Sequence, residues 1–378
     1  MITRQLSLGQ MPEYPFERDY PIDKIVFFDI ETTGFAANST YLYLIGCAFY
    51  KDDSFSLIQW FAEDIKEESL LLSSFFEFLK DYEVLLHYNG TGFDIPYLLK
   101  KCQQCKLDYS FDHLTNIDIY RKILPLKKLF RLPSFKLKSI EAFLEIRRTD
   151  IYDGGDLIQV YQGYLGKKHY ETLRRLRSPE TAVTAPSEAE QLLGLLLLHN
   201  EDDIRGLLLI SSILHYADLF EKPIRILQAG VEGHRFLIQF ELSSSLPVKV
   251  SGGNDLVRLT AEGTAASLSI QIYEGELKYF YENYKDYYYL TSEDSVIHKS
   301  LAQYVDTEYR KKAKPSNCYT RKQGLFAPQY DVLFTPSFRL DHQSKLSFLE
   351  IHTDFLLQEE KLEEYVKHIL KIIISKAE

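Results

Sequence analysis

The sequence predicts an α/β domain, in which helices cover a sheet, followed by a smaller α+β domain with an antiparallel sheet. Three observations lead to this prediction. The run Ile25-Val26-Phe27-Phe28 is continuously apolar, as a strand buried on both faces requires. Strand-like and helix-like patterns then alternate as far as residue 220. After Pro223, β-forming residues surround glycine-rich turns, which is typical of antiparallel strands.

Residues 1–21 are polar and interrupted by prolines, so we expect an N-terminal arm there. The α/β domain follows over residues 22–220. Within it, Ser187 and Glu190 have the spacing of a capping box, which predicts the start of a long helix. We expect strands at 25–28, 41–50, 55–61 and 84–86, and helices at 67–80, 95–104, 187–203 and 206–220.

Residues 221–378 form the second domain in this prediction. A helix-like pattern covers 294–312, and apolar residues at helical spacing predict an amphipathic helix over 356–376. We expect strands at 236–242, 246–250, 256–260, 266–273 and 277–281.

The composition narrows the range of functions. The formal net charge is -10, from 44 Lys and Arg against 54 Asp and Glu. This argues against a protein that coats duplex DNA, because such binding depends on neutralising many phosphates. The negative charge does not argue against an enzyme that binds one end of a nucleic-acid strand locally. With 4 Cys and no apolar stretch near the roughly 20 residues of a bilayer span, we expect a cytoplasmic protein without a membrane segment.

The end of the first buried strand carries two carboxylates, Asp29 and Glu31. Residues two apart in a strand share a face, so these side chains project together. Two carboxylates a few ångströms apart repel each other by about a few kcal/mol at a surface-like dielectric. The pair persists if it is solvated, if one member is protonated, or if a cation lies between them. A polar strand end therefore remains an alternative to a metal site.

Two more acidic segments follow. The first, His87-Tyr88-Asn89-Gly90-Thr91-Gly92-Phe93-Asp94, is a glycine-rich turn between a strand and a helix, and Asp94 suits the helix start. In the second, His199-Asn200-Glu201-Asp202-Asp203, residues four apart share one helix face, so His199 and Asp203 can address the same point. Taken singly, the first is explained as a structural turn and the second as a solvated helix face.

Together and in this order, the three segments resemble the DEDD class of 3′→5′ exonucleases, which have a ribonuclease H-like fold. Asp29-Ile30-Glu31 with the following Thr-Thr-Gly is similar to the opening motif, and Asn89 to Asp94 to the second. The likeness extends to the bacterial YprB-like subgroup, through segments 117–120, 137–141 and 148–154, and covers about residues 22–220. The resemblance implies a mixed sheet flanked by helices.

The resemblance implies that Asp29, Glu31, Asp94 and Asp203 are ligands for two divalent cations, with Asp202 as the competitor for the last position. Hard oxygen ligands without cysteine suit Mg²⁺ or Mn²⁺. Two such ions roughly 4 Å apart can hold the attacking water and the leaving oxygen of a phosphodiester.

The resemblance fails at one position, that of the general base. In the family, a Tyr stands four residues before the last Asp, or a His stands five before it. Here His199 stands four before Asp203, and Leu198 stands five before it. Histidine is the side chain best suited to exchange a proton near neutral pH, so His199 can orient or deprotonate a water, although a purely structural role is the alternative.

Further residues are candidates for substrate contacts or for support of the site. Phe35 and Phe93 can stack on or wedge the last base, with core packing as the alternative for Phe93. Asp118 is expected to lie behind the metal ligands, where it holds a water or a lysine. The basic stretch 121–148 is expected to bind the backbone phosphates of the nucleic acid. The candidate substrate-binding residues are Thr32, Thr33, Asn89, Phe93, Lys127 and Lys128.

We therefore expect a two-metal 3′→5′ exonuclease acting on a single strand or a frayed 3′ end, with DNA preferred over RNA. The alternatives are a nucleic-acid-binding or scaffold protein of the same fold without efficient catalysis, and an endonuclease. The tyrosine-rich run 279–289 and the basic run 310–314 suit either a stacking platform for single strands or a β-sheet core with a surface for a protein partner.

Overall fold

The computed structural model describes residues 1–147, 154–177 and 186–375. The chain forms two compact units, the first from residues 1–124 and 132–215, and the second from 125–131 and 216–378. The turn expected at 148–154 lies, except for its last residue, outside the described residues.

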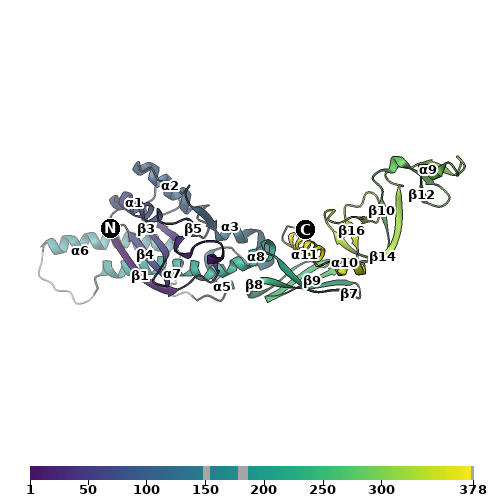
Figure 1. Cartoon of the computed structure of the whole chain (residues 1–378). Coiled ribbons are helices and arrows are strands. Elements are labelled where there is room, and N and C mark those ends of the chain that lie inside the picture. Colours follow the sequence, from purple (N-terminus) through teal and green to yellow (C-terminus); the bar gives the residue numbers. More distant parts are fainter. Residues whose placement is uncertain (148–153, 178–185, 376–378) are drawn as a thin grey trace. The chain divides into compact units, whose positions relative to one another are not determined.

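The first unit contains a mixed six-stranded sheet in the order β1-β4-β3-β2-β5-β6 (Figure 1). The first four strands in this order pair antiparallel, whereas β5 runs parallel to both β2 and β6. The four strands predicted for this domain correspond to β2, β3, β4 and β5. In sheet order, the strands are β1 Ile2–Gln10, β4 Ser54–Phe61, β3 Leu42–Lys51, β2 Ile25–Thr32, β5 Val84–His87 and β6 Thr115–Asp118.

Strand β1 corrects the expectation of an arm over residues 1–21. Ile2–Gln10 pairs antiparallel with β4, from Ile2 opposite Phe61 to Gln10 opposite Phe55, and forms the edge of the sheet. Its backbone hydrogen bonds come from a partner about fifty residues away, and most of its side chains remain at least partly exposed. An edge strand of this kind carries little hydrophobic signal, which explains why the polar sequence suggested an arm.

Helices cover both faces of this sheet (Figure 1). On one face, α1 and α2 enclose a core that includes Phe28 and Phe75. On the other, α6 and α7 pack against Tyr43 and Phe61, although the sequence pattern predicts no element at α6. The helices of this unit are α1 Glu68–Leu79, α2 Asp94–Cys105, α3 Ile119–Ile123, α5 Leu137–Phe143, α6 Gly154–Arg177 and α7 Glu188–Ile210.

Helix α7 begins at the predicted capping box. The Glu190 backbone N–H donates to Ser187 Oγ at 3.2 Å, and the Ser187 N–H donates to Glu190 Oε2 at 2.8 Å. From this start the helix continues without a break through His199 and Asp203, which places the third acidic segment across the sheet from α1 and α2. The capping prediction is confirmed.

The second unit is built mainly from antiparallel strands, as predicted. Three strands form the sheet β7-β8-β9, on which α11 packs; four form the closed barrel β10-β14-β16-β15; and three form the sheet β12-β11-β13. Its strands are β7 Ile224–Glu232, β8 Arg235–Gly253, β9 Val257–Gln271, β10 Tyr273–Phe280, β11 Tyr287–Leu290, β12 Ser295–His298, β13 Arg310–Lys312, β14 Tyr319–Gln329, β15 Phe338–Arg339 and β16 Ser347–Glu350. Its helices are α4 Lys127–Phe130, α8 His215–Glu221 (all but its first residue), α9 Lys299–Ala302, α10 Thr353–Leu356 and α11 Glu359–Ser375.

The helix expected over 294–312 is wrong. The segment contains β12, the short helix α9 and β13. Both strands pair with β11, which places Tyr288 opposite Ile297 and opposite Lys312. Pairing with a neighbouring strand thus overrides a local pattern that is compatible with a helix. The amphipathic helix expected over 356–376 is present as α11.

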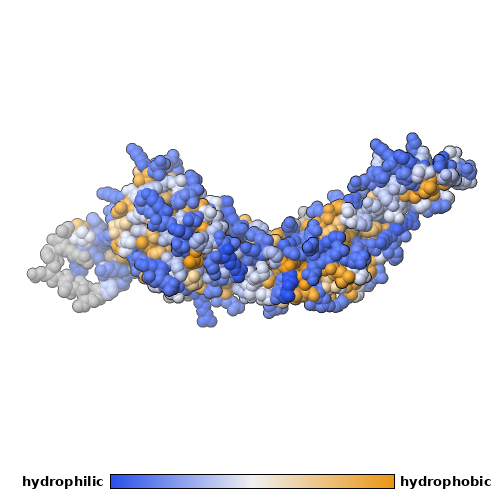
Figure 2. Space-filling view, viewed as in Figure 1, coloured by the Kyte–Doolittle hydropathy of each residue, from blue (hydrophilic) through white to orange (hydrophobic). Residues whose placement is uncertain are grey.

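No helix among the described residues is both long enough and apolar enough to cross a membrane. On the visible face, hydrophobic residues (orange) lie in small groups among hydrophilic ones (blue) (Figure 2).

Candidate metal centre and active site

The structure brings the opening and closing acidic segments together. Glu31 on β2 and His199 and Asp203 on α7 each offer one ligand atom, and these atoms lie within 4.8 Å of one another. His199 Nε2 is 3.6 Å from Glu31 Oε1 and 3.4 Å from Asp203 Oδ2. The spacing of four residues does direct His199 and Asp203 to one point, as the sequence predicts.

Asp29 belongs to the same group of carboxylates. Burial raises the pKa of Asp29 well above its usual range, and repulsion from Asp203, Glu31 and Asp94 raises it further. The Asn200 side-chain amide opposes this effect, because its Nδ2 donates to Asp29 Oδ2 at 3.2 Å. The other three carboxylates are therefore close enough to Asp29 to influence its ionisation.

Asp94 begins α2 and completes the group. Burial raises its pKa to about 7, and repulsion from Asp118 and Asp203 adds to this, while backbone N–H groups donating to the carboxylate act in the opposite direction. Asp203, and not its neighbour Asp202, is the residue whose carboxylate joins Glu31 and His199. The geometry thus favours Asp203 in the choice between these two residues.

The turn before Asp94 is held in place by Asp118. Asp118 Oδ1 accepts from the Asn89 backbone N–H at 2.9 Å, and its Oδ2 accepts from the Thr91 N–H at 3.2 Å. Asn89 adopts a left-handed conformation with φ of 60°. The Gly90 N–H donates to His87 Nδ1 at 2.9 Å, and a Cβ at Gly90 would lie 2.6 Å from the same ring. Asp118 therefore stabilises the turn that positions Asp94 at the site.

Asn200 links Asp29 to the centre of the sheet. Its Oδ1 accepts from Gln59 Nε2 at 3.0 Å, and the same Gln59 amide donates to the backbone oxygen of Leu197 at 2.9 Å. Gly46 lies opposite Asp29 in the β2–β3 ladder, and a Cβ there would overlap Asn200 Oδ1. The sequence predicts none of these roles, because Gln59, Asn200 and Gly46 meet only in the folded chain.

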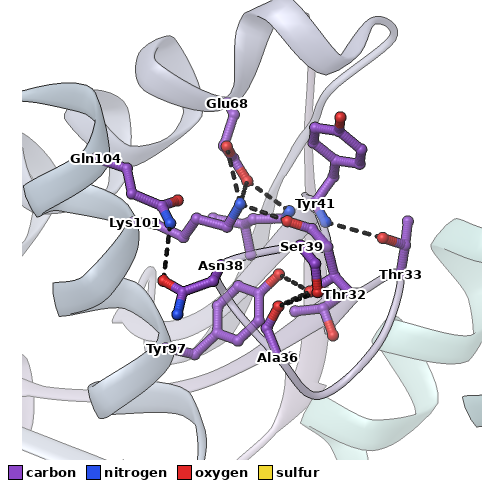
Figure 3. A network of polar contacts seen from close by, with 12 residues as sticks. Thr32, Thr33, Ala36, Asn38, Ser39, Tyr41, Glu68, Tyr97, Lys101 and Gln104 are labelled. Atoms are coloured by element: carbon purple, nitrogen blue, oxygen red, sulfur yellow. Dashed lines mark hydrogen bonds and ion pairs between the residues drawn. The ribbon is translucent and has the colours of Figure 1, made fainter.

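The loop after Glu31 is braced by its own hydroxyl groups (Figure 3). Thr33 Oγ1 accepts from the Tyr41 N–H at 2.8 Å. Thr32 Oγ1 donates to the Gly34 oxygen at 2.9 Å. Both threonines, predicted to contact substrate, thus have hydroxyl groups that hold the loop.

Helices α1 and α2 support the same loop. Lys101 Nζ lies 2.9 Å from Glu68 Oε1 and also donates to the Thr40 oxygen. Glu68 in turn accepts from the Leu42 N–H at 2.7 Å, and Tyr97 shares a hydrogen bond of 2.9 Å with Thr40. Figure 3 shows these side chains pointing toward the loop. An ion pair this buried is costly to break, so the loop is expected to keep its shape.

A cavity of about 610 Å³ adjoins the carboxylates. Phe35, with 90% of its surface exposed, meets Phe93 edge-on at 5.7 Å, and Tyr88 meets Tyr120 edge-on at 5.8 Å. Phe93, predicted either to stack on a base or to pack in the core, packs against the hydrophobic core while partly buried and also lines the cavity. The lining residues are Asp29, Ile30, Phe35, Tyr88, Asn89, Phe93, Asp94, Tyr120, Phe135, Lys136 and Leu137.

The sequence matches the family model of the RNase H superfamily over residues 26–215, just over half of the chain. This range includes all three acidic segments. The chain belongs to the RNase H superfamily. The mixed sheet flanked by helices, expected from the motifs, is therefore confirmed as an RNase H-like fold.

Parts of the chain are similar to other known proteins. A DNA polymerase of Ostreid herpesvirus 1 (isolate France) is 35% identical over 51 residues, which cover 13% of this chain and 3% of that polymerase. The family B DNA polymerase of the hyperthermophilic archaeon Pyrobaculum calidifontis is similar at 13% identity and a TM-score of 0.33, over 75% of this chain and 39% of that one. E. coli Exonuclease I in complex with a dT13 oligonucleotide is similar at 14% identity and a TM-score of 0.27, over 40% of this chain and 42% of that one.

The RNase H-like unit presents a donor set that suits hard divalent cations. The converging groups are carboxylates with one imidazole, and oxygen-rich sets favour Mg²⁺ or Mn²⁺. Burial, together with repulsion from neighbouring carboxylates, raises the pKa values of Asp29 and Asp94. A bound cation would offset that repulsion, so the residues fit the metal that the motifs imply.

Two of the predicted phosphate contacts belong to the second unit, although the RNase H superfamily match spans them. Lys127 and Lys128 begin α4, which belongs to the second unit and packs on β8 and α11. Lys136, from the same basic stretch, lines the cavity beside the carboxylates instead. The role of Lys127 and Lys128 in phosphate binding stays a prediction.

We expect Gly46→Ala to lower cation affinity and activity by about 10- to 100-fold, because the added methyl group displaces Asn200 from Asp29. Overpacking at this buried site should also cost about 1–3 kcal/mol of stability. Calorimetric titration with Mn²⁺ and thermal unfolding measure the two effects. Gly194→Ala is the matched control, since nothing lies within 4 Å of a Cβ there and alanine favours a helix. Equal cation affinity in the two variants would contradict the role of Asn200.

Proposed function

We propose that the chain is a metal-dependent 3′→5′ exonuclease that hydrolyses phosphodiester bonds at the 3′ end of single-stranded nucleic acid, with DNA preferred over RNA. One observation carries the proposal. Glu31, His199 and Asp203 meet within 4.8 Å, and Asp29 and Asp94 adjoin them beside an aromatic cavity. Membership of the RNase H superfamily supports it, and segments 117–120 and 137–141 favour the YprB-like subgroup.

Asp29, Glu31, Asp94 and Asp203 would hold two divalent cations, Mg²⁺ or Mn²⁺. Such ions supply Lewis acidity and neutralise the charge that develops on phosphodiester oxygens. The protein's part is to keep these carboxylates converged, and three supports for this are visible. Asn200 orients Asp29, and Asp118 holds the turn before Asp94. The loop after Glu31 is held in its conformation by the hydrogen bond between Thr33 and Tyr41.

His199 is the proposed general base. Its Nε2 faces both Glu31 and Asp203, so it can accept a proton from a water held between them. We expect His199→Ala to lower turnover by about 10²- to 10⁴-fold while Mn²⁺ affinity changes much less. Single-turnover hydrolysis and calorimetric titration separate the two quantities. Near-normal turnover would assign His199 a structural role.

The cavity suits an unpaired terminal nucleotide. Phe35, Phe93, Tyr88 and Tyr120 offer ring faces and edges on which a base can stack, and Lys136 can contact a phosphate. A base within a duplex is already stacked and paired. A single strand or a frayed 3′ end therefore meets these residues more readily.

Labelled oligonucleotides test the proposal. With Mn²⁺, a 5′-labelled single strand should give a ladder that shortens stepwise, and a 3′-labelled strand should release labelled mononucleotide at once. EDTA should stop both reactions. Cleavage of a circular strand would instead identify an endonuclease, and binding without shortening would identify a scaffold protein. Matched DNA and RNA strands report the sugar preference.

A further inference from the structure

The second unit contains a cavity of about 410 Å³, within the size range of small-ligand sites. Its walls come from β10, the turn after it, and the region of β15. β10 and the turn after it contribute the aromatic side chains Tyr279, Phe280, Tyr281 and Tyr284. The lining residues are Tyr279, Phe280, Tyr281, Glu282, Tyr284, Pro315, Val332, Thr335, Ser337, Arg339 and His342.

The aromatic rings of this cavity continue into a larger cluster. Tyr281 stacks on Tyr287 of β11 with ring centroids 4.9 Å apart and planes 16° apart. Tyr279 meets Tyr281 edge-on at 5.4 Å, and Phe280 meets His342 edge-on at 5.3 Å. Tyr279, Phe280 and Tyr281 are only partly buried. Ring surface therefore remains in reach of a ligand.

Positive charge accompanies these rings. Arg339 lies in the wall, and within the described part of the chain no carboxylate is within ion-pair distance of it. Lys278 is its neighbour in the β10–β15 ladder. On β13, Arg310 lies over the Tyr288 ring, 5.2 Å from its centroid, and Lys311 pairs with Tyr289 of the same strand β11.

The charge balance of this region differs from that of the whole chain. Residues 273–350 carry 11 Lys and Arg against 11 Asp and Glu, whereas the chain as a whole has a net charge of -10. A polyanion is therefore repelled less here than elsewhere on the protein.

One wall residue also has an unused polar atom. Ser337 Oγ is buried and has no hydrogen-bond partner among the residues that the structure describes. A ligand that enters the cavity can exchange a hydrogen bond with this hydroxyl, and the exposed Glu282 carboxylate can accept one from an amino group. The cavity thus combines ring faces, a cation and hydrogen-bonding groups.

We infer that this cavity binds a base of single-stranded nucleic acid, with the adjoining phosphate at Arg339. Base stacking on aromatic rings is sequence-tolerant, and arginine adds both charge and stacking. A peptide partner would also use the apolar part of the wall, but the combination of stacked tyrosine rings with an arginine favours a base and its phosphate. The inference does not rest on the proposed function, because the cavity binds a strand whether or not the RNase H-like unit cleaves it.

Fluorescence anisotropy with a labelled oligo-dT strand, in EDTA to prevent cleavage, tests the stacking contact. Tyr281→Ala should weaken binding by about 5- to 100-fold, whereas Tyr281→Phe should bind nearly as well as the parent chain. Tyr304→Ala is the control, since Tyr304 is 80% exposed and lies outside the cavity wall. Equal binding by Tyr281→Ala and Tyr304→Ala would overturn the inference.

The charge at Arg339 predicts a separate effect. Arg339→Ala should reduce the slope of log affinity against log salt by about 0.7, because one phosphate contact is lost, and Lys345→Ala, which removes an exposed charge outside the wall, should leave it unchanged. An unchanged slope in Arg339→Ala would contradict a phosphate at this residue.

Photocrosslinking gives a result that does not depend on the stability of variants. A strand that carries a photoreactive thymidine should attach to peptides containing residues 279–284. Crosslinks there without hydrolysis would uphold this site and refute the nuclease. Hydrolysis with crosslinks only to the first unit would refute this site alone, and so would capture of a peptide ligand that oligo-dT does not displace.

Discussion

Asp29→Asn is expected to abolish hydrolysis and, at the same time, to stabilise the cation-free protein. The carboxylate is a proposed cation ligand, so its loss should lower turnover by at least about 10³-fold. Burial and three neighbouring carboxylates raise the pKa of Asp29, which means that its ionised form destabilises the fold. A neutral amide of the same shape removes this repulsion and still allows Asn200 to donate to its oxygen.

We expect a gain in the free energy of unfolding of the cation-free variant near neutral pH, because the buried carboxylate that its neighbours repel is gone. Denaturant unfolding in EDTA measures it, and the oligonucleotide assay with Mn²⁺ measures turnover. Asp112→Asn removes one exposed carboxylate from the same unit, so it should change neither quantity. A variant that loses activity and stability together would show that Asp29 serves the fold and would weaken the case for a metal site.

Cation binding is expected to tighten strongly as pH rises toward neutrality. Burial and repulsion raise the pKa of Asp94 from an ordinary value of 3.8 to about 7, and the pKa of Asp29 is also raised. Without a cation, the stability contributed by the protonated carboxyl is fully present below pH 3.8 and is lost as pH rises through about 7. A cation binds the deprotonated forms, so binding must release protons within this window.

We therefore expect Mn²⁺ affinity to increase by at least about tenfold between roughly pH 5.5 and pH 8, and the stabilisation by Mn²⁺ to be larger at the higher pH. Calorimetric titration in buffers with different ionisation enthalpies counts the released protons. Asp94→Asn should release fewer protons and show a flatter pH dependence. Affinity that is independent of pH in the parent chain would contradict the assignment of these carboxylates as ligands.

The supports of the site explain how so much negative charge is kept in one place. Asn200, held by Gln59, donates to Asp29, and Asp118 anchors the turn that ends at Asp94. Each support comes from a different element than the carboxylate it holds. The repulsion within the group is thus opposed by hydrogen bonds to the sheet and the turn, which a cation would supplement.

Local periodicity was enough to predict several parts of this protein. The continuous apolar run at Ile25 predicts a central strand, and Ser187 with Glu190 predicts the start of α7. Side chains two residues apart in a strand share a face, which places Asp29 and Glu31 together on β2. Side chains four residues apart in a helix also share a face, which places His199 and Asp203 together on α7. These relations depend only on the geometry of a single strand or helix, so they can be predicted from the sequence.

Other features exist only through tertiary structure. Strand β1 is a strand because β4 provides its hydrogen bonds, and the segment expected as a helix at 294–312 is drawn into pairing with β11. The proximity of Asp203 to Glu31 and the closeness of Gly46 to Asn200 likewise depend on elements that lie far apart in the chain. The sequence by itself determined the strand, the helix and the acidic motifs. Only the folded structure decided which side chains meet, because burial and pairing with distant segments are not encoded in local spacing.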